Sequence, residues 1–158
     1  TDVNELKQLF KVLHGAGVDG FLISPAYGYA HVGESFFFRK KELADFFKKL
    51  EPEFKKYNFL GSPLYLDFVQ GKRELDCAPW STPTRNPIGW RSPCYQLADK
   101  HFSSYKELIG KTDWKRYGPK SKNPRCAECA VHCGFEPASV LEGKSFKDIM
   151  TLIGWQFA

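Results

Sequence analysis

Cysteine placement constrains this chain of 158 residues more than any other feature. Three of its five cysteines lie within eight residues, in the stretch PRCAECAVHCGFE from Pro124 to Glu136. If that stretch is helical or nearly so, the C-x2-C-x3-C spacing puts all three sulfurs on one helix face. An odd number of cysteines does not fit a fully paired disulfide framework, so thiolates that bind a metal are the favoured interpretation.

A fourth ligand has to come from elsewhere, and the candidates are Cys77, Cys94 and His132. Turn-forming residues lie between Cys77 and Cys94, which predicts a hairpin that brings these two cysteines near each other. The full pattern is C-x11-G-x4-C, then 31 residues, then Cys126, Cys129 and Cys133. We expect His132 to support or pack against the site rather than bind the metal.

The spacing by itself leaves two metals open. Zinc takes four cysteines, or three cysteines and a histidine, and one C-x2-C knuckle is present. Zinc ribbons usually have two comparable knuckles, and Cys77 and Cys94 are too far apart in sequence to form the second. An iron-sulfur cluster also takes four thiolates and accepts irregular spacing.

Composition narrows the class of protein. A hydrophobic content of 42% and a charged content of 26% are typical of an ordinary globular chain. The net charge of +5 comes without long basic blocks, so no nucleic acid partner is expected. Neither a transmembrane-length apolar run nor a secretory signal is present, and we expect a cytoplasmic protein.

Apolar periodicity and capping residues predict the elements. Residues 2–14 are expected to form an amphipathic helix, and residues 18–24, VDGFLIS, a buried parallel strand. A second helix over 39–57 contains a possible break at Pro52, and Ser62 and Pro63 begin a third. The last helix is expected over 145–157, docked on the rest of the protein, with peripheral contact to the inner membrane as an open alternative.

Longer segments then resemble a known family. SPLYLDFVQG, CAPWSTPTRNPIGWRSPCY, TDWKRYG and CAECAVHCGFE resemble the C-terminal region of radical SAM enzymes of the adenosyl-hopene transferase type, which act in hopanoid biosynthesis. VDGFLISPAYGYA resembles the sixth strand of that family's barrel with its following loop. The C-x11-G-x4-C element resembles the start of twitch or SPASM extensions, which hold auxiliary 4Fe-4S clusters.

This resemblance implies an α/β fold. Residues 1–72 would form the last portion of a partial (β/α) barrel, and residues 73–158 a cysteine-rich, loop- and helix-rich extension. The extension would hold one auxiliary [4Fe-4S] cluster, with at least three ligands among Cys77, Cys94, Cys126, Cys129 and Cys133. Four residues of the loop after the strand are expected to bind cofactor or line an apolar pocket: Ser24, Pro25, Tyr27 and Tyr29.

By the same resemblance, the intact enzyme would cleave S-adenosylmethionine at a catalytic [4Fe-4S] cluster and add the 5′-deoxyadenosyl radical to an apolar alkene such as a hopene. A flavodoxin or ferredoxin would supply the electron. The C-x3-C-x2-C loop that this chemistry needs is missing, and the sequence begins at Thr1 without a Met, so we expect a fragment that is inactive alone. No catalytic residue is assigned. The alternative is a zinc-stabilised binding module without catalysis.

Overall fold

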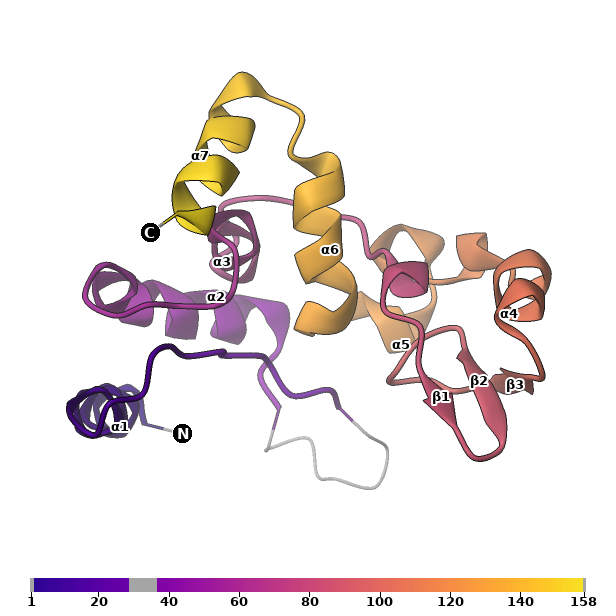
Figure 1. Cartoon of the computed structure of the whole chain (residues 1–158), viewed down its shortest axis with the longest axis horizontal. Helices are drawn as coiled ribbons and strands as arrows, with labels where there is room; N and C mark the ends of the chain where they lie inside the picture. Colours follow the sequence, from indigo (N-terminus) through magenta and orange to yellow (C-terminus); the bar gives the residue numbers. More distant parts are fainter. Residues whose placement is uncertain (1, 29–36, 158) are drawn as a thin grey trace.

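The computed structural model describes residues 2–28 and 37–157 as a helix-rich unit with one small sheet (Figure 1). Helix α6 stands between the helices near the two termini and the part that carries the sheet. The α-helices are α1 (Val3–Gly15), α2 (Lys40–Leu50), α3 (Pro63–Val69), α4 (Tyr105–Lys111), α5 (Pro124–Ala127), α6 (His132–Glu142) and α7 (Phe146–Gln156). The 3-10 helices are η2 (Glu51–Lys55), η3 (Pro79–Ser81), η4 (Trp114–Arg116) and η5 (Pro119–Ser121).

Local capping explains where the main helices begin. The carboxylate of Asp2 accepts the N–H of Asn4 at 2.6 Å, and the hydroxyl of Ser62 accepts the N–H of Tyr65 at 3.2 Å. Ser145 caps α7 in the same way through the N–H of Asp148. These side chains satisfy amides that have no partner within the helix. The helices predicted at the two ends of the chain and at Ser62 are therefore confirmed.

The helix predicted over 39–57 ends earlier than expected. Helix α2 stops at Leu50, and Pro52 occupies the first turn of η2, which follows directly. Proline has no N–H to donate within a helix, but it fits the first turn of a new one. The break at Pro52 is therefore confirmed.

The segment predicted as a parallel strand over 18–24 forms a single parallel bridge, between Phe21 and Phe59. The N–H of Phe21 donates to the carbonyl of Asn58 at 2.9 Å, and the N–H of Leu60 donates to the carbonyl of Phe21 at 2.9 Å. A parallel strand needs a neighbour to pair with along its length. Asn58 to Leu60 supplies that neighbour for one residue only, so no strand forms.

The sheet lies in the cysteine-rich half and is antiparallel, with the order β1-β2-β3. Its strands are β1 (Arg85–Asn86), β2 (Gly89–Ser92) and β3 (Lys100–Phe102). The Asn86 side-chain carbonyl accepts the N–H groups of Ile88 and Gly89, which closes the turn. Gly89 has φ of 148°, and a β-carbon there would lie 2.6 Å from the carbonyl oxygen of Phe102. The hairpin predicted between Cys77 and Cys94 is thus confirmed, and β3 was not predicted.

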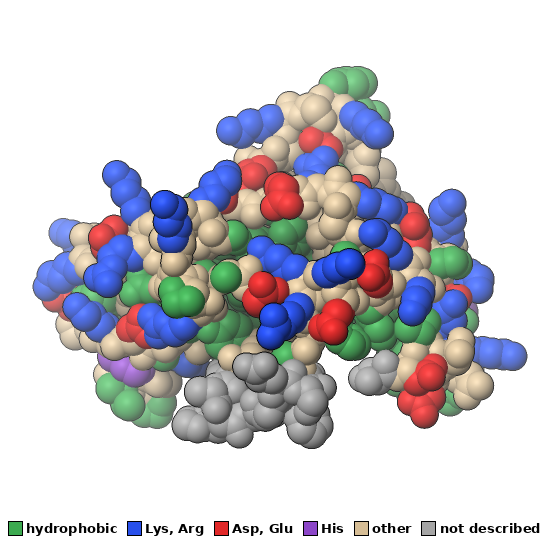
Figure 2. All heavy atoms as spheres, turned by 180° about the vertical axis from the view of Figure 1, so that it is seen from behind, with side chains coloured by type: hydrophobic (Ala, Val, Ile, Leu, Met, Phe, Trp, Pro, Cys, Tyr) green, Lys and Arg blue, Asp and Glu red, His purple; other side chains and the backbone are tan. Residues whose placement is uncertain are grey.

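Helix α7 packs on α3 and leaves much of its apolar surface exposed. The indole N–H of Trp155 donates to the carbonyl of Phe59 at 3.2 Å, and Arg73 forms an ion pair with Asp148. On the face shown in Figure 2, basic and acidic side chains are interspersed, with apolar atoms visible at several places between them. None of the helices in the described part of the chain is long and apolar enough to span a membrane.

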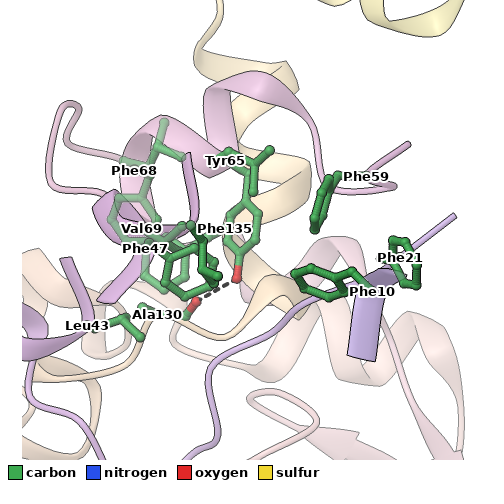
Figure 3. Close-up of a cluster of buried hydrophobic side chains, with 13 residues drawn as sticks. Phe10, Phe21, Leu43, Phe47, Phe59, Tyr65, Phe68, Val69, Ala130 and Phe135 are labelled. Carbon is green, nitrogen blue, oxygen red and sulfur yellow. Dashed lines mark hydrogen bonds between the residues drawn. The ribbon is translucent and has the colours of Figure 1, made fainter. Parts of the chain in front are cut away.

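Aromatic side chains dominate the core (Figure 3). Phe68 stacks on Phe135 of α6 with ring centroids 4.4 Å apart, and the fully buried Tyr65 donates its hydroxyl to the carbonyl of Ala130 at 2.9 Å. This core therefore runs across residue 72, where the sequence predicts a boundary between two modules. The division into a barrel portion and an extension stays a prediction.

Candidate metal centre

The five cysteines are free thiols that come from three segments of the chain. Four of them line one cavity of about 30 Å3: Cys77, Cys94, Cys126 and Cys129. The fifth, Cys133, lines a different and larger cavity. The fold therefore gathers residues up to 52 positions apart in sequence around one small space, which is the arrangement that four-thiolate metal sites need.

Cys77 is held against the first turn of α6. The N–H of its neighbour Ala78 donates to the carbonyl of Gly134 at 2.9 Å. A β-carbon on Gly134 would lie only 2.3 Å from the Cys77 sulfur, far inside van der Waals contact. Gly134 thus leaves the space that the Cys77 side chain occupies, and any other residue would displace that sulfur.

Cys94 lies at the start of a tight turn that follows the hairpin. Burial, the largest cause, raises the pKa of Cys94 above its ordinary value, and the nearby backbone amides of Leu97 and Gln96 lower it in part. Ala98 completes the turn with φ of 43°, and its N–H reaches the carbonyl of Cys94. Amides aimed at a sulfur stabilise a thiolate, as they do around metal-bound cysteines.

The triplet from Cys126 to Cys133 does not form one continuous helix, so the single helix face predicted from its spacing is wrong. Cys126 belongs to α5, Cys129 lies in the connection, and Cys133 is the second residue of α6. The chain is extended at Val131, where φ is −67° and ψ is 136°. The reason is tertiary, because the carbonyl of Ala130 is held by Tyr65 in the core.

Contacts from other elements fix the connection between α5 and α6. The carboxylate of Glu128 accepts the N–H of Lys40, at the start of α2, at 2.9 Å. The guanidinium of Arg125 donates two hydrogen bonds to the carboxylate of Asp99, at 2.7 and 2.8 Å. Bidentate pairs of this kind restrict geometry as well as stabilise it. Cys126 thereby lies between two anchored side chains, and Cys129 directly follows the second of them.

Without a metal, burial favours the neutral thiol at Cys77, Cys94, Cys129 and Cys133. Burial is the largest cause that raises the pKa of Cys129 to about 11 and that of Cys133 to about 12, and neighbouring cysteines raise both further. Burial and the same mutual repulsion raise the pKa of Cys77 well above its ordinary value. A bound cation would reverse this balance, because it stabilises each thiolate directly.

A single metal ion and an iron-sulfur cluster make different demands on the spacing of the four thiols. Among residues 2–28 and 37–157, no three His, Cys, Asp or Glu side chains are grouped closely enough to hold one metal ion. Tetrahedral zinc needs its sulfurs about 3.8 Å apart, as follows from a Zn–S bond of about 2.3 Å. In a cluster each thiolate binds its own iron, so the sulfurs lie farther apart. Four thiols are the donor set that such a cluster takes.

The residues predicted to bind cofactor make different contacts. The Tyr27 side chain lines the thiol cavity, and its hydroxyl donates to the carbonyl of Arg125 at 3.0 Å. Burial raises the pKa of Tyr27 to about 12. Ser24 lies 2.7 Å from the Nδ1 of His132, and its hydroxyl also reaches the carbonyl of Pro25 at 3.3 Å. Tyr29 lies outside the described residues, and cofactor binding by this loop stays a prediction.

Sequence reasoning missed the residues that shape the site without carrying a thiol. Gly134 directly follows Cys133, and Gln96 and Leu97 lie inside the turn that begins at Cys94, but nothing in their types marks them. Glu128 was a signal that the sequence did offer, because it lies inside the C-x2-C motif. A charged side chain held in place between two cysteines needs a hydrogen-bond partner from another part of the chain. The His132 ring bonds to Ser24, and its supporting role at a metal site stays a prediction.

The described residues thus define a helix-rich chain with a small antiparallel sheet and four thiols around one cavity. Residues 21–153 match the model of a family described as a domain of unknown function, DUF3463, and the chain belongs to that family. No curated protein and no solved structure matches the sequence.

Proposed function

We propose that this chain holds an auxiliary [4Fe-4S] cluster through Cys77, Cys94, Cys126 and Cys129. One observation carries the proposal: these four thiols line the same cavity, while Cys133 lines another. Four thiolates are the usual ligand set of such clusters. When bound, the cluster would supply one-electron transfer.

The protein's own residues would do three things at this centre. Backbone N–H groups around Cys94 and Cys129 would stabilise the thiolates by hydrogen bonds to sulfur, an effect that also tunes cluster potentials. Leu97 and Phe135 line the same cavity and would limit the entry of water. The Asp99–Arg125 pair would fix the position of Cys126, which directly follows Arg125.

We further propose that the chain is the C-terminal part of a radical SAM enzyme of the adenosyl-hopene transferase type, a cytoplasmic protein served by a flavodoxin or ferredoxin. The family-like segments around the cysteines support this proposal. So does the convergence of Tyr27 from the N-terminal loop with the cysteines of the C-terminal half. The intact enzyme would transfer an adenosyl group to an apolar alkene such as a hopene.

Metal analysis of the 158-residue chain, purified without oxygen and reconstituted with iron and sulfide, tests the cluster. A brown protein with about four iron and four sulfide per chain is the expected result. A colourless protein with one zinc would instead identify a zinc-stabilised binding module. If no metal is found and all five thiols can be titrated as free, both the cluster and the zinc assignment would be overturned.

The enzymatic proposal has its own test in the longer parent protein. We expect that protein to contain a C-x3-C-x2-C loop upstream of Thr1 and to consume S-adenosylmethionine under reducing conditions. The product would be an adenosylated alkene, detectable by mass spectrometry. A parent without that loop would overturn the radical chemistry and leave the cluster assignment standing.

A further inference from the structure

A second cavity, of about 450 Å3, lies beside the thiol cavity and is formed by three segments. Thr82 and Thr84 come from the chain before and at the edge of β1, Tyr95 comes from the turn after β2, and His132 and Cys133 come from the start of α6. Gln96 lines both cavities. A volume of this size is within the range of small-molecule sites.

The wall of this second cavity is fixed by hydrogen bonds. The hydroxyl of Thr82 donates to the carbonyl of Cys133 at 2.6 Å, which ties the first segment to α6. The Nδ1 of His132 lies 2.7 Å from the Ser24 hydroxyl, so the imidazole is held in one orientation. Its Nε2 has no hydrogen-bond partner within the described part of the chain. A rigid wall with one open ring nitrogen is preorganised for a polar atom of a ligand.

Charge limits what this cavity could bind. No lysine or arginine is among the described residues that line it, and Glu136 contributes a carboxylate. One oxygen of Glu136 already accepts the N–H of Ser62 at 2.7 Å, and the other is buried. An anionic ligand would meet this carboxylate with no lysine or arginine in the described wall itself to compensate, which is unfavourable.

The remaining wall suits a ring. Tyr95 and Pro137 contribute flat apolar surfaces, and the threonines add methyl groups beside neutral hydroxyls. Tyr95 also carries the guanidinium of Arg91 at 5.3 Å from its ring centroid, which disfavours a second cation on that ring. We propose that this cavity binds an uncharged, ring-bearing organic molecule, with its polar atom on His132 and its ring against Tyr95 and Pro137.

This proposal goes beyond the metal centre and does not depend on which metal the thiols bind. It also places a small-molecule site at the start of α6 rather than in the loop of residues 24–29. The Cys133 thiol, left out of the four-thiol cavity, would be part of the wall against which the molecule lies.

Three probes that share one ring separate the charge classes: indole, tryptamine and indole-3-acetate. Equilibrium dialysis of each against the full chain should give a dissociation constant on the order of 1 mM for indole, as expected for so small a ligand. We expect indole-3-acetate to bind at least about tenfold more weakly. Equal binding of the anion, or tighter binding of tryptamine than of indole, would overturn the uncharged class.

Two variants locate the site, and a third is their control. Thr84→Trp fills the cavity and should abolish indole binding, whereas Lys115→Trp, an exposed position on η4, should leave it unchanged. Tyr95→Ala changes a half-exposed side chain, so it should fold normally and weaken indole binding at least about threefold. Indole binding that survives both Thr84→Trp and Tyr95→Ala would place the site elsewhere. Iron content measured on the same samples reports the metal centre separately.

Discussion

Gly134 and Cys77 lie so close that a β-carbon on Gly134 would meet the Cys77 sulfur at 2.3 Å. Glycine inside a helix ordinarily costs about 0.5–1 kcal/mol relative to alanine. Its presence in the first turn of α6 is explained by the sulfur that packs there.

We expect Gly134→Ala to lower the metal affinity of the chain at least about tenfold, because the new methyl group displaces the Cys77 sulfur. The measurement is competition for iron or zinc with a chelator. Gly154→Ala is the matched control, since a β-carbon at Gly154 on α7 has nothing within 4 Å. The control should keep full affinity, and so equal losses in both variants would contradict the role of Gly134.

The two groups of cysteines should respond differently to serine. Replacement of any of Cys77, Cys94, Cys126 or Cys129 should lower metal affinity at least about tenfold, because serine does not replace a thiolate ligand. Cys133→Ser should retain the metal, since Cys133 lines the larger cavity. Metal content and cluster absorbance, measured after reconstitution, distinguish these outcomes. Loss of the cluster in Cys133→Ser would place that thiol among the ligands.

Tyr65 connects the aromatic core to the metal centre. Tyr65→Phe should destabilise the chain by about 1–3 kcal/mol, because the carbonyl of Ala130 would remain buried without its hydrogen bond. Urea denaturation measures this change in the free energy of unfolding. Tyr105→Phe, at a half-exposed position, should change that free energy by no more than about 0.5 kcal/mol. Equal stability of the two variants would mean that water replaces the Tyr65 hydroxyl.

The ion pair between Arg73 and Asp148 should make the docking of α7 depend on pH. The hydrogen bond from Arg73 lowers the pKa of Asp148 below its ordinary value of 3.8. A lowered pKa stabilises the folded state above the unfolded value, and this contribution disappears as the pH falls through the folded value. Because both side chains are partly exposed, we expect at most about 1 kcal/mol.

Asp148→Asn tests that pH dependence. The variant should be less stable than the parent at pH 7, and the difference should shrink below about pH 3.8 as Asp148 is protonated. Urea denaturation at several pH values measures the difference in the free energy of unfolding. Asp113→Asn, whose carboxylate makes no capping hydrogen bond, serves as the control. A difference that grows toward acid would contradict the assignment.

Local signals made much of the secondary structure predictable. Asp2, Ser62 and Ser145 cap their helices through their own hydroxyl or carboxylate oxygens, and Pro52 ends α2 because it lacks an N–H. The turn at Asn86 is also local, because the Asn86 side chain accepts the N–H of Ile88, only two residues further along the chain. Each of these effects acts over a few residues, so the sequence contains the whole cause.

The sequence failed where the cause was distant. Phe21 forms one bridge rather than a strand, because the length of its neighbour near Phe59 cannot be deduced from its own apolar run. Helix α5 ends at Ala127, before Cys129, and Tyr65, more than 60 residues earlier, holds the carbonyl of Ala130 just beyond that end. A hydrogen bond across the core outweighs the helical preference of the local chain.

From the sequence alone came the number of thiols, their spacing and the expectation of a metal, since those depend only on residue type and order. The tertiary structure decided which thiols share a cavity, because Cys77 and Cys94 reach α5 and α6 only when α6 packs against α3 and η3. It also placed Cys133 in the wall of a second cavity, which His132 lines as well. Sulfurs distant in sequence meet only through the packing of the core, and that packing is a property of the whole chain.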